Sequence, residues 1–431
     1  MFDFANQAYT LLIITVIFGD LFTRVIVGDA DNDYRLGNLL WSLSLATSYF
    51  LVVISAPVFG AIMDYSAARK QFLFASYVLT VVATALLYFV APGFVLLGVL
   101  LIIVSNYAYS IGESFIASFL PDLGPPEDQG KISGFGWALG YVGGLVSTAF
   151  ALMFLGEVSL ENFDNVRWVG PYAAAFFLIT AIPTFLWVRE RRQGRRLPRH
   201  RDYLNMGMTR VRESLRDLRG YRDLAVFLLS VFFSMSGIYI IISFTFVYGA
   251  QVIGWDEQTR VLMFVTVQVT ATLGAIGFGF IQDRIGARLT YNITLFLWIL
   301  AILLIYATPQ MTLWLRDAFD VQWQAQHVFL VVGTLAGMCL GACQSATRAL
   351  VGIFSPSDKA AEFFGFWGLS NKLAGIVGLV GIGLLQVAVG LHQAILFCAV
   401  LFFLAFIVVM FVDQTRGRAR AEASIDSAPT P

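Results

Sequence analysis

Long apolar runs, separated by short polar segments, follow one another along the whole chain. Each run offers roughly the 20 helical residues that cross a hydrocarbon core of about 30 Å. We place twelve such runs at residues 4–27, 38–62, 72–91, 95–119, 131–155, 168–188, 224–249, 260–281, 288–307, 327–348, 362–389 and 391–412. Uniform runs of this length are unlike the alternating strands of a membrane barrel. The pattern therefore predicts an all-α membrane protein with twelve transmembrane helices.

A strongly polar segment divides the twelve runs into two sets of six. We predict an N-terminal six-helix bundle at 1–188, a basic cytoplasmic linker at 189–223, a C-terminal six-helix bundle at 224–413 and a cytoplasmic tail at 414–431. Within the linker, apolar residues recur at the three- and four-residue spacing of an amphipathic helix: Leu204, Met208, Val211, Leu215 and Leu218.

Composition and charge agree with this picture. Of the 431 residues, 58% are hydrophobic and 13% are charged, whereas soluble domains carry about 25% charged residues. If the N-terminus is inside, 21 of the 28 Lys and Arg residues fall on the inner side. The positive-inside rule then places both termini in the cytoplasm. No basic footprint of a nucleic-acid-binding protein is present, whereas contact with anionic membrane lipids would suit the linker.

The chain offers little material for catalysis or metal binding. Its three cysteines, Cys339, Cys343 and Cys398, all fall inside predicted spans, and its three histidines are scattered. We assign no disulfide, no metal site and no cofactor. A polytopic membrane enzyme would need a clustered catalytic set, so we expect no enzyme. No Walker loop is present, which argues against direct ATP coupling.

A short pattern of glycine, aspartate and basic residues occurs twice, each time in the break between two apolar runs. The first copy contains Gly60, Asp64 and Arg69, and the second contains Gly279, Asp283, Arg284 and Arg288. One solvated loop would explain a single copy. Two copies half a chain apart indicate that two similar bundles were joined end to end.

A second correspondence links the halves. Setting Gly134 against Gly365 requires an offset of 231 positions, whereas Asp64 and Asp283 lie 219 positions apart. The C-terminal half therefore has a net dozen residues more between these landmarks. We assign them to a long outer loop at 308–326.

The duplicated pattern resembles the loop motif of the major facilitator superfamily. More specific blocks are DFANQAY at the start, LPDLGPPEDQGKISGFGWALGYVGG in the middle, and QSATRAL followed by EFFGFWGLSNKLAG late in the chain. With these blocks in order, the chain resembles the vacuole effluxer family, the autophagy-related amino-acid effluxers of fungi and their bacterial relatives. The resemblance implies a major facilitator fold of two pseudo-symmetric six-helix bundles in a bacterial cytoplasmic (inner) membrane.

In this superfamily the first, fourth, seventh and tenth spans line a central cavity. Polar residues in lipid are costly and should face one another or water. We therefore expect substrate or coupling residues among the polar side chains of these spans and of the eleventh: Asp3, Asn6, Asn106, Tyr109, Glu113, Tyr239, Gln344, Arg348 and Lys372. The alternative for the serines and threonines is that they bond back to their own helix.

Glu113 lies about two turns inside the cytoplasmic end of the fourth span. A carboxyl group at this depth is a candidate proton carrier, since its protonated form tolerates an apolar surrounding. It could instead pair with Arg348 of the tenth span and close an inner gate, or form a static ion pair. We favour the gate. Lys372 needs a carboxylate, which a substrate or the C-terminal bundle could supply. Asp3 could cap its helix or bind solute.

The resemblance gives Asp64 and Asp283 a role in conformational switching, in which each holds a neighbouring helix N-terminus in one state and releases it in the other. We expect a secondary transporter that exports a small polar solute, of amino-acid or peptide-like character, by alternating access, with protons as a candidate coupling ion. A receptor or scaffold with a transporter fold is the remaining alternative.

Overall fold

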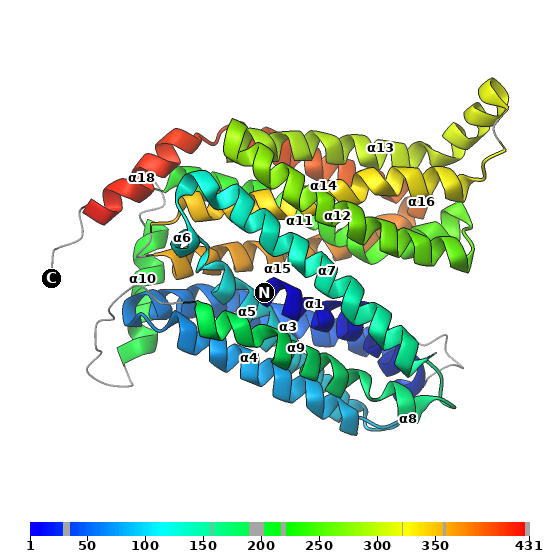
Figure 1. Ribbon diagram of the computed structural model, residues 1–431, viewed down its shortest axis with the longest axis horizontal. Helices are drawn as coiled ribbons and strands as arrows, with labels where there is room; N and C mark the ends of the chain where they lie inside the picture. The colour runs from blue at the N-terminus through cyan, green and yellow to red at the C-terminus, as the bar shows by residue number, and fades with distance from the viewer. Residues whose placement is uncertain are drawn as a thin grey trace. The chain divides into compact units, whose positions relative to one another are not determined.

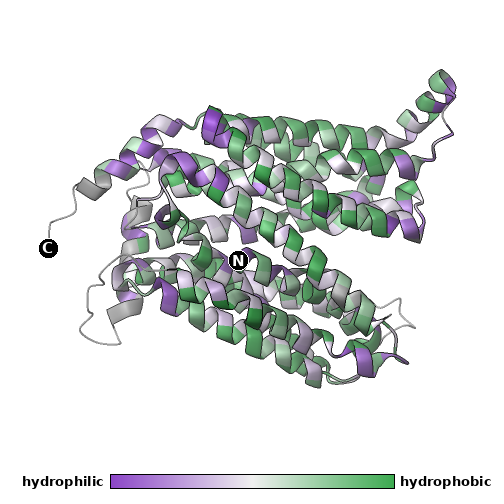
Figure 2. Cartoon of the chain, in the orientation of Figure 1, coloured by the Kyte–Doolittle hydropathy of each residue, from purple (hydrophilic) through white to green (hydrophobic). Residues whose placement is uncertain are grey.

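The computed structural model describes residues 1–28, 35–156, 158–188, 202–216, 221–320, 322–356 and 359–426, and the regular structure among them is entirely helical. Twelve helices are long and apolar enough to cross a membrane. Figure 2 shows hydrophobic residues along these helices and hydrophilic ones on α10 (Asp202–Arg216) and α18 (Gln414–Asp426). The predicted all-α fold with twelve transmembrane helices is confirmed.

The chain packs as two compact units. Unit 1 comprises Met1–Phe119, Leu139–Val211 and Lys359–Leu369, and unit 2 comprises Leu120–Ala138, Arg212–Asp358 and Ser370–Pro431. Helices α7 (Gln129–Leu155) and α15 (Ala360–Val389) are each divided between the units. The N-terminal end of α7 packs within unit 2, and the N-terminal end of α15 packs within unit 1.

Unit 1 contains the first six spans without the N-terminal end of α7, and it also contains most of α10 and the N-terminal end of α15 (Figure 1). Besides part of α7, its elements are α1 (Phe2–Ala8), α2 (Phe18–Leu21), α3 (Arg35–Ser66), α4 (Arg69–Leu86), α5 (Val95–Ala117), α8 (Phe163–Val166) and α9 (Val169–Trp187). Helix α1 packs on α9, α3 packs on α5, and α4 packs on both α5 and α9. Large side chains such as Tyr9, Phe18 and Phe22 fill one of its apolar cores.

Unit 2 repeats this arrangement. Besides the start of α7, its elements are α6 (Leu120–Leu123), α11 (Arg222–Tyr248), α12 (Glu257–Ile285), α13 (Ala287–Phe319), α14 (Ala325–Phe354), most of α15, α16 (Leu391–Ala394), α17 (Leu396–Val409) and α18. Helix α11 packs on α17, α12 packs on α14, and α13 packs on both α14 and α17. The same four pairings therefore occur in each unit, in the same chain order.

The first span is irregular. Between α1 and α2 the backbone is π-helical over Tyr9–Val16, and it is π-helical again over Phe22–Val27. The hydroxyl of Thr15 donates to the carbonyl of Thr10, five residues earlier, at 3.0 Å. Because π-helical turns occur often at functional sites, this span is a favourable place for solute contacts.

Helix α13 is longer than the sequence predicted. We expected the span to end at residue 307 and a loop to follow over 308–326, but the helix continues through Pro309 to Phe319. Proline cannot bond to the carbonyl of Ile305, which instead accepts from the hydroxyl of Tyr248 at 3.3 Å. Such side-chain substitutes are how membrane helices tolerate proline. The loop prediction was therefore wrong over residues 308–319, which are helical.

The predicted amphipathic helix of the linker is present as α10. Its Gly207 packs against α3, where an added Cβ would lie 3.0 Å from Ile62 and 3.1 Å from Val58. The rest of the predicted linker, residues 189–201 and 217–220, lies outside the described residues.

Candidate functional site

The first candidate site is a latch formed by Asp64, Arg69 and the N-terminus of α15. The carboxylate of Asp64, near the end of α3, accepts the backbone N–H of Glu362 at 2.8 Å. Its other oxygen accepts from Nε of Arg69 at 3.1 Å and lies 3.0 Å from the second guanidinium nitrogen. A carboxylate suits this place because helix N-termini are partly positive.

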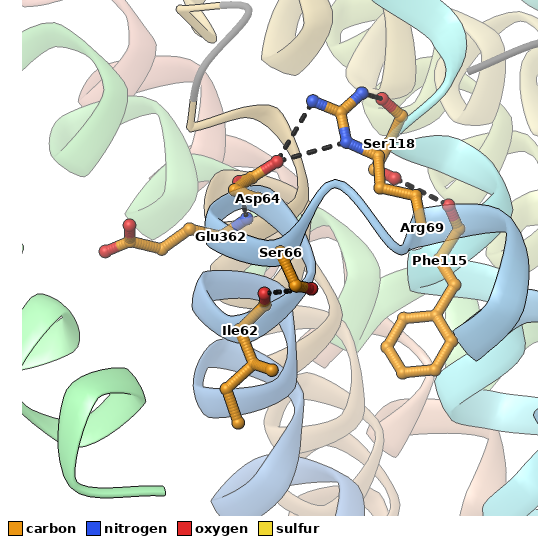
Figure 3. A network of polar contacts seen from close by, with 7 residues as sticks. All are labelled: Ile62, Asp64, Ser66, Arg69, Phe115, Ser118 and Glu362. Carbon is orange, nitrogen blue, oxygen red and sulfur yellow. Dashed lines mark hydrogen bonds and ion pairs between the residues drawn. The ribbon is translucent and has the colours of Figure 1, made fainter. Parts of the chain in front are cut away.

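Arg69 completes this first latch. Figure 3 shows its guanidinium between Asp64 and Ser118, whose carbonyl accepts from Nη1 at 3.2 Å, while the side chain of Glu362 points away from Asp64. The side chains of both Arg69 and Asp64 are buried. Buried charges persist only when they are paired and hydrogen-bonded, so the two side chains depend on each other.

Glycines allow the helices of the first latch to approach closely. A Cβ on Gly60 would lie 2.8 Å from the Cα of Glu362, and one on Gly365 would lie 2.6 Å from the carbonyl oxygen of Ala56. Neither distance is possible for a real side chain, so α3 and α15 touch through backbone at both points. Small residues at such crossings are typical of membrane helix packing.

The second latch is formed by Asp283, Lys131 and the N-terminus of α7. Asp283, near the end of α12, accepts the backbone N–H groups of Gly130 at 3.0 Å and Lys131 at 3.2 Å. The Lys131 amine lies 3.6 Å from the same carboxylate. Glycine again permits the approach, because a Cβ on Gly134 would lie 3.3 Å from the Cα of Gly279.

The two latches are related by the internal repeat. The contact of Glu362 with Asp64 corresponds to the contact of Lys131 with Asp283. Glu362 lies 231 positions after Lys131, and Asp283 lies 219 positions after Asp64. These are the offsets that separate the paired motifs in the sequence. The repeat therefore extends from residue patterns to individual hydrogen bonds.

The basic residues of the two latches differ. Arg288, the counterpart of Arg69, donates from its guanidinium to the carbonyl of Met410 at 2.8 Å and from its backbone to Gln414 at 2.9 Å. Arg284 is exposed. The charge beside Asp283 thus comes from the helix that is held, whereas the charge beside Asp64 comes from its own loop.

The C-terminal helix α18 lies against the same end of unit 2. Arg416 binds both carboxylate oxygens of Asp223 at 2.7 Å, and Arg418 contacts Glu127 at 2.6 Å, just before α7. A Cβ on Gly417 would lie 2.5 Å from the ring of Phe354. Ion pairs and close packing therefore fasten α18 to the segments around the second latch.

A chain of polar side chains runs along the first and fourth spans in unit 1. The hydroxyl groups of Thr10 and Tyr109 lie 2.7 Å apart, and Tyr109 donates to Glu113 at 3.0 Å. The rings of Tyr9 and Tyr109 are stacked with centroids 4.7 Å apart, and Tyr9 bonds Ser105 at 2.8 Å. The structure thus brings together two predicted site residues, Tyr109 and Glu113, at the irregular part of the first span.

Arg348 has a defined role inside unit 2. Its guanidinium donates to the hydroxyl of Ser133 at 3.2 Å and to the Ser133 carbonyl at 2.9 Å, and it lies 5.3 Å from the ring of Trp137. It therefore holds the N-terminal end of α7. Glu113 belongs to unit 1, and its predicted pairing with Arg348 stays a prediction.

The other predicted site residues occupy varied places. Asn106 donates to Ser48 at 2.5 Å, and Tyr239 presents its ring edge to Gly375, 3.4 Å from an added Cβ. Asn6 and Lys372 are buried, and Gln344 is partly buried on α14. The backbone of Asp3 lies beside Gly140 of α7. Solute contacts at these residues stay predictions.

Sequence reasoning missed the residues that the aspartates hold. Gly130, Lys131 and Glu362 were not predicted as partners, although the blocks at 129–134 and 360–365 were already matched by their offset. Ser133, which connects Arg348 to α7, carried no signal, because a serine in an apolar helix commonly bonds to its own backbone.

The fold and its two latches define a transporter of the major facilitator superfamily, integral to a membrane. The solved structure of the human organic anion transporter MFSD10 has the same fold, with a TM-score of 0.70 at 15% identity over 95% of this chain and 96% of that one. The model of the Atg22-like vacuole effluxers matches residues 39–422, so the chain belongs to that family.

Two relatives illustrate the family's range. An uncharacterised MFS-type transporter, YxiO of Bacillus subtilis, is 25% identical over 96% of this chain and 94% of its own length. Autophagy-related protein 22-1 of Penicillium rubens is 21% identical over 89% of this chain and 76% of its own length. Family and fold are those of transporters, and transporters of this kind move small solutes.

Proposed function

We propose that this protein exports a small polar solute of amino-acid or peptide-like character, in exchange for protons that enter through Glu113, and we give this role of Glu113 precedence over the predicted gate with Arg348 because Glu113 ends the hydrogen-bonded chain from Thr10 and Tyr109. The observation that supports it most is the hydrogen-bonded chain of Thr10, Tyr109 and Glu113 in the fourth span and the irregular first span. Hydroxyl groups and a carboxylate would satisfy amine and amide groups of such a solute. The export direction is supported by the family's effluxer description.

The two latches are proposed to set the transport cycle. When Asp64 binds the N-terminus of α15 and Asp283 binds the N-terminus of α7, the transporter is proposed to be held in the conformation that is closed on the side of the membrane where the latches lie. Release of both helix ends would allow the alternate state. We place this side in the cytoplasm, as the distribution of Lys and Arg predicts.

Flux measurements in proteoliposomes test solute class and coupling together. A mixture of radiolabelled L-amino acids should exchange across the membrane in counterflow, and a proton gradient should drive net movement against the solute gradient. Glu113→Gln should retain counterflow and lose proton-driven accumulation, because the carboxamide cannot carry a proton. Asp164→Asn, at a carboxylate that is 93% exposed, is the matched control and should behave as the wild type.

Each outcome bears on one part of the proposal. Equal proton-driven flux in Glu113→Gln and wild type would refute the role of Glu113. No counterflow of any labelled amino acid in the wild-type protein would refute the solute class. Gradient-driven movement in the inward sense alone would refute export. For the predicted pairing with Arg348, additive effects of Glu113→Ala and Arg348→Ala on flux would exclude a direct interaction.

A further inference from the structure

The end of α13 extends beyond the length that a membrane requires. Its 33 residues span about 50 Å at about 1.5 Å per residue, whereas the hydrocarbon core takes roughly 30 Å. The extra turns coincide with the net dozen residues by which the C-terminal half exceeds its counterpart. They are thus an addition to the repeated unit rather than a part of it.

The added turns form an amphipathic helix. Apolar side chains recur at spacings of three and four along one face: Met311, Trp314, Leu315, Ala318 and Phe319. The other face carries Gln310, Arg316 and Asp317, with Leu313 as its apolar exception, and Thr312 lies at the border of the two faces beside Phe319. Arg316 and Asp317 form an ion pair at 3.7 Å on that face. This is the division of faces found in helices that lie at a membrane surface.

Most of the apolar face is exposed within the described part of unit 2, whereas Met311 and Leu315 are partly buried. Trp314 is 58% exposed and Phe319 is 62% exposed, and Ala318 between them is exposed as well. Figure 1 shows the last turns of α13 bending away from the rest of unit 2, and α13 contains Pro309. Proline is a common cause of such bends. The bend carries the apolar face out of the bundle.

We propose that residues 308–319 lie in the membrane–water interface at the end of α13 opposite Asp283, with the apolar face in the lipid. The face is continuous with the lipid-facing stripe of the span, where Phe296 is 59% and Leu303 is 47% exposed. Tryptophan favours this depth, phenylalanine is common on the apolar face of interfacial helices, and the ion pair can remain in water. The extension would therefore fix the tilt and depth of α13 in the bilayer.

Spin labels on the two faces test this placement. Cys339, Cys343 and Cys398 are buried free thiols that can be replaced by alanine to give a cysteine-free background. Single cysteines are then introduced at Leu315 and Phe319 on the apolar face, at Gln310 and Asp317 on the polar face, and at Leu303 as a lipid reference. In proteoliposomes, power saturation compares collision with oxygen, which concentrates in lipid, and with a water-soluble nickel chelate.

The expected ratio of oxygen to nickel collisions is high at Leu315 and Phe319, close to that at Leu303, and several-fold lower at Gln310 and Asp317. Equal ratios on the two faces would overturn the proposal. Dipolar broadening between labels at Phe319, with low collision rates for both reagents, would overturn it in favour of a second copy of the chain as the covering partner.

A charge introduced on the apolar face gives a second, independent test of the proposal. Leu315→Glu should lower the oxygen-to-nickel ratio of the Phe319 label by several-fold, because a carboxylate at this depth draws the helix toward water. Gln310→Glu adds the same charge to the polar face and should leave the ratio unchanged. If Leu315→Glu has no effect while the Leu303 label still reports lipid, the apolar face does not lie in the membrane.

Discussion

Replacing Asp64 by asparagine should weaken its latch far more than the same change at Asp283. Asparagine keeps a carbonyl oxygen that can accept the Glu362 N–H, so the hydrogen bond to α15 can survive in part. The charge is lost, however, and the Arg69 guanidinium, whose side chain is 3% exposed, loses its buried carboxylate while it keeps the bond to the Ser118 carbonyl. The perturbation is therefore mainly the loss of the carboxylate that pairs with a buried guanidinium.

The size of the effect at each latch follows from how deeply its ion pair is buried. Removing one partner of a buried ion pair costs about 3–5 kcal/mol. At Asp283 the partner amine of Lys131 is 38% exposed and 3.6 Å away, and pairs of that kind contribute about 0–1 kcal/mol. Since about 1.4 kcal/mol is a factor of ten, Asp64→Asn should accelerate local opening of the α15 N-terminus on the order of 100-fold or more. Asp283→Asn should accelerate opening of the α7 N-terminus by less than about tenfold.

Hydrogen exchange of the backbone amides, read by mass spectrometry in lipid nanodiscs, measures both openings in one experiment. Peptides that cover the start of α15 and the start of α7 report the two latches separately. Asp20→Asn removes an exposed ion pair with Arg24 in the first span and should leave both peptides unchanged. In Asp64→Asn, the added change Arg69→Met should restore part of the protection, because the unpaired charge is gone. Equal effects of the two aspartate variants, or no recovery in the double variant, would refute the reasoning.

Three further outcomes are expected. Gly365→Ala should destabilise the contact of α15 with α3 by about 1–3 kcal/mol through overpacking, whereas Gly383→Ala on the same helix meets open space and should be neutral in thermal unfolding. Asp256 caps α12 by accepting the Thr259 N–H at 2.7 Å, and this bond lowers the pKa of the carboxyl group. The stabilisation by the ionised Asp256 carboxylate is therefore present above the ordinary pKa of 3.8 and is lost as the pH falls through the lower pKa of the folded state. The difference in melting temperature between wild type and Asp256→Ala should shrink in acid and not in base. Arg418→Glu and Glu127→Arg should each lower the protection of α18 from hydrogen exchange, and the double variant should restore it. If the double variant does not recover protection, the 2.6 Å contact between Arg418 and Glu127 does not stabilise α18.

The sequence predicted the spans and the positions of both latches well, because these depend on local pattern. Apolar runs of sufficient length determine membrane helices with little help from tertiary structure. The aspartates were identified because the motif occurs twice. Their partners were not, because a backbone N–H is a group that every residue except proline carries, and only packing decides which one a carboxylate meets.

The misjudged end of α13 has a different cause. Pro309 indicates a helix end in a local reading, since the residue before proline is biased away from helix. The structure overrides this bias because Tyr248, far away in the sequence, bonds the carbonyl that proline cannot reach. The amphipathic spacing from Met311 to Phe319 is a weaker signal than uniform hydrophobicity, because it covers little more than two helical turns.

The inequality of the two latches bears on the order in which they open. Asp64 is buried and held from two directions, by Arg69 and by the α15 N-terminus, whereas Asp283 relies on α7 for both its hydrogen bonds and its nearest positive charge. When α7 leaves, Asp283 loses the N–H groups and the amine together, and its carboxylate gains access to water. When α15 leaves, Asp64 keeps Arg69. Hydration offsets more of the lost interaction at Asp283, so the second latch is expected to open first. Arg418 of α18 binds Glu127, just before α7, and so lies beside the second latch, the weaker of the two. There a modest surface ion pair can change the equilibrium between the closed and the open latch.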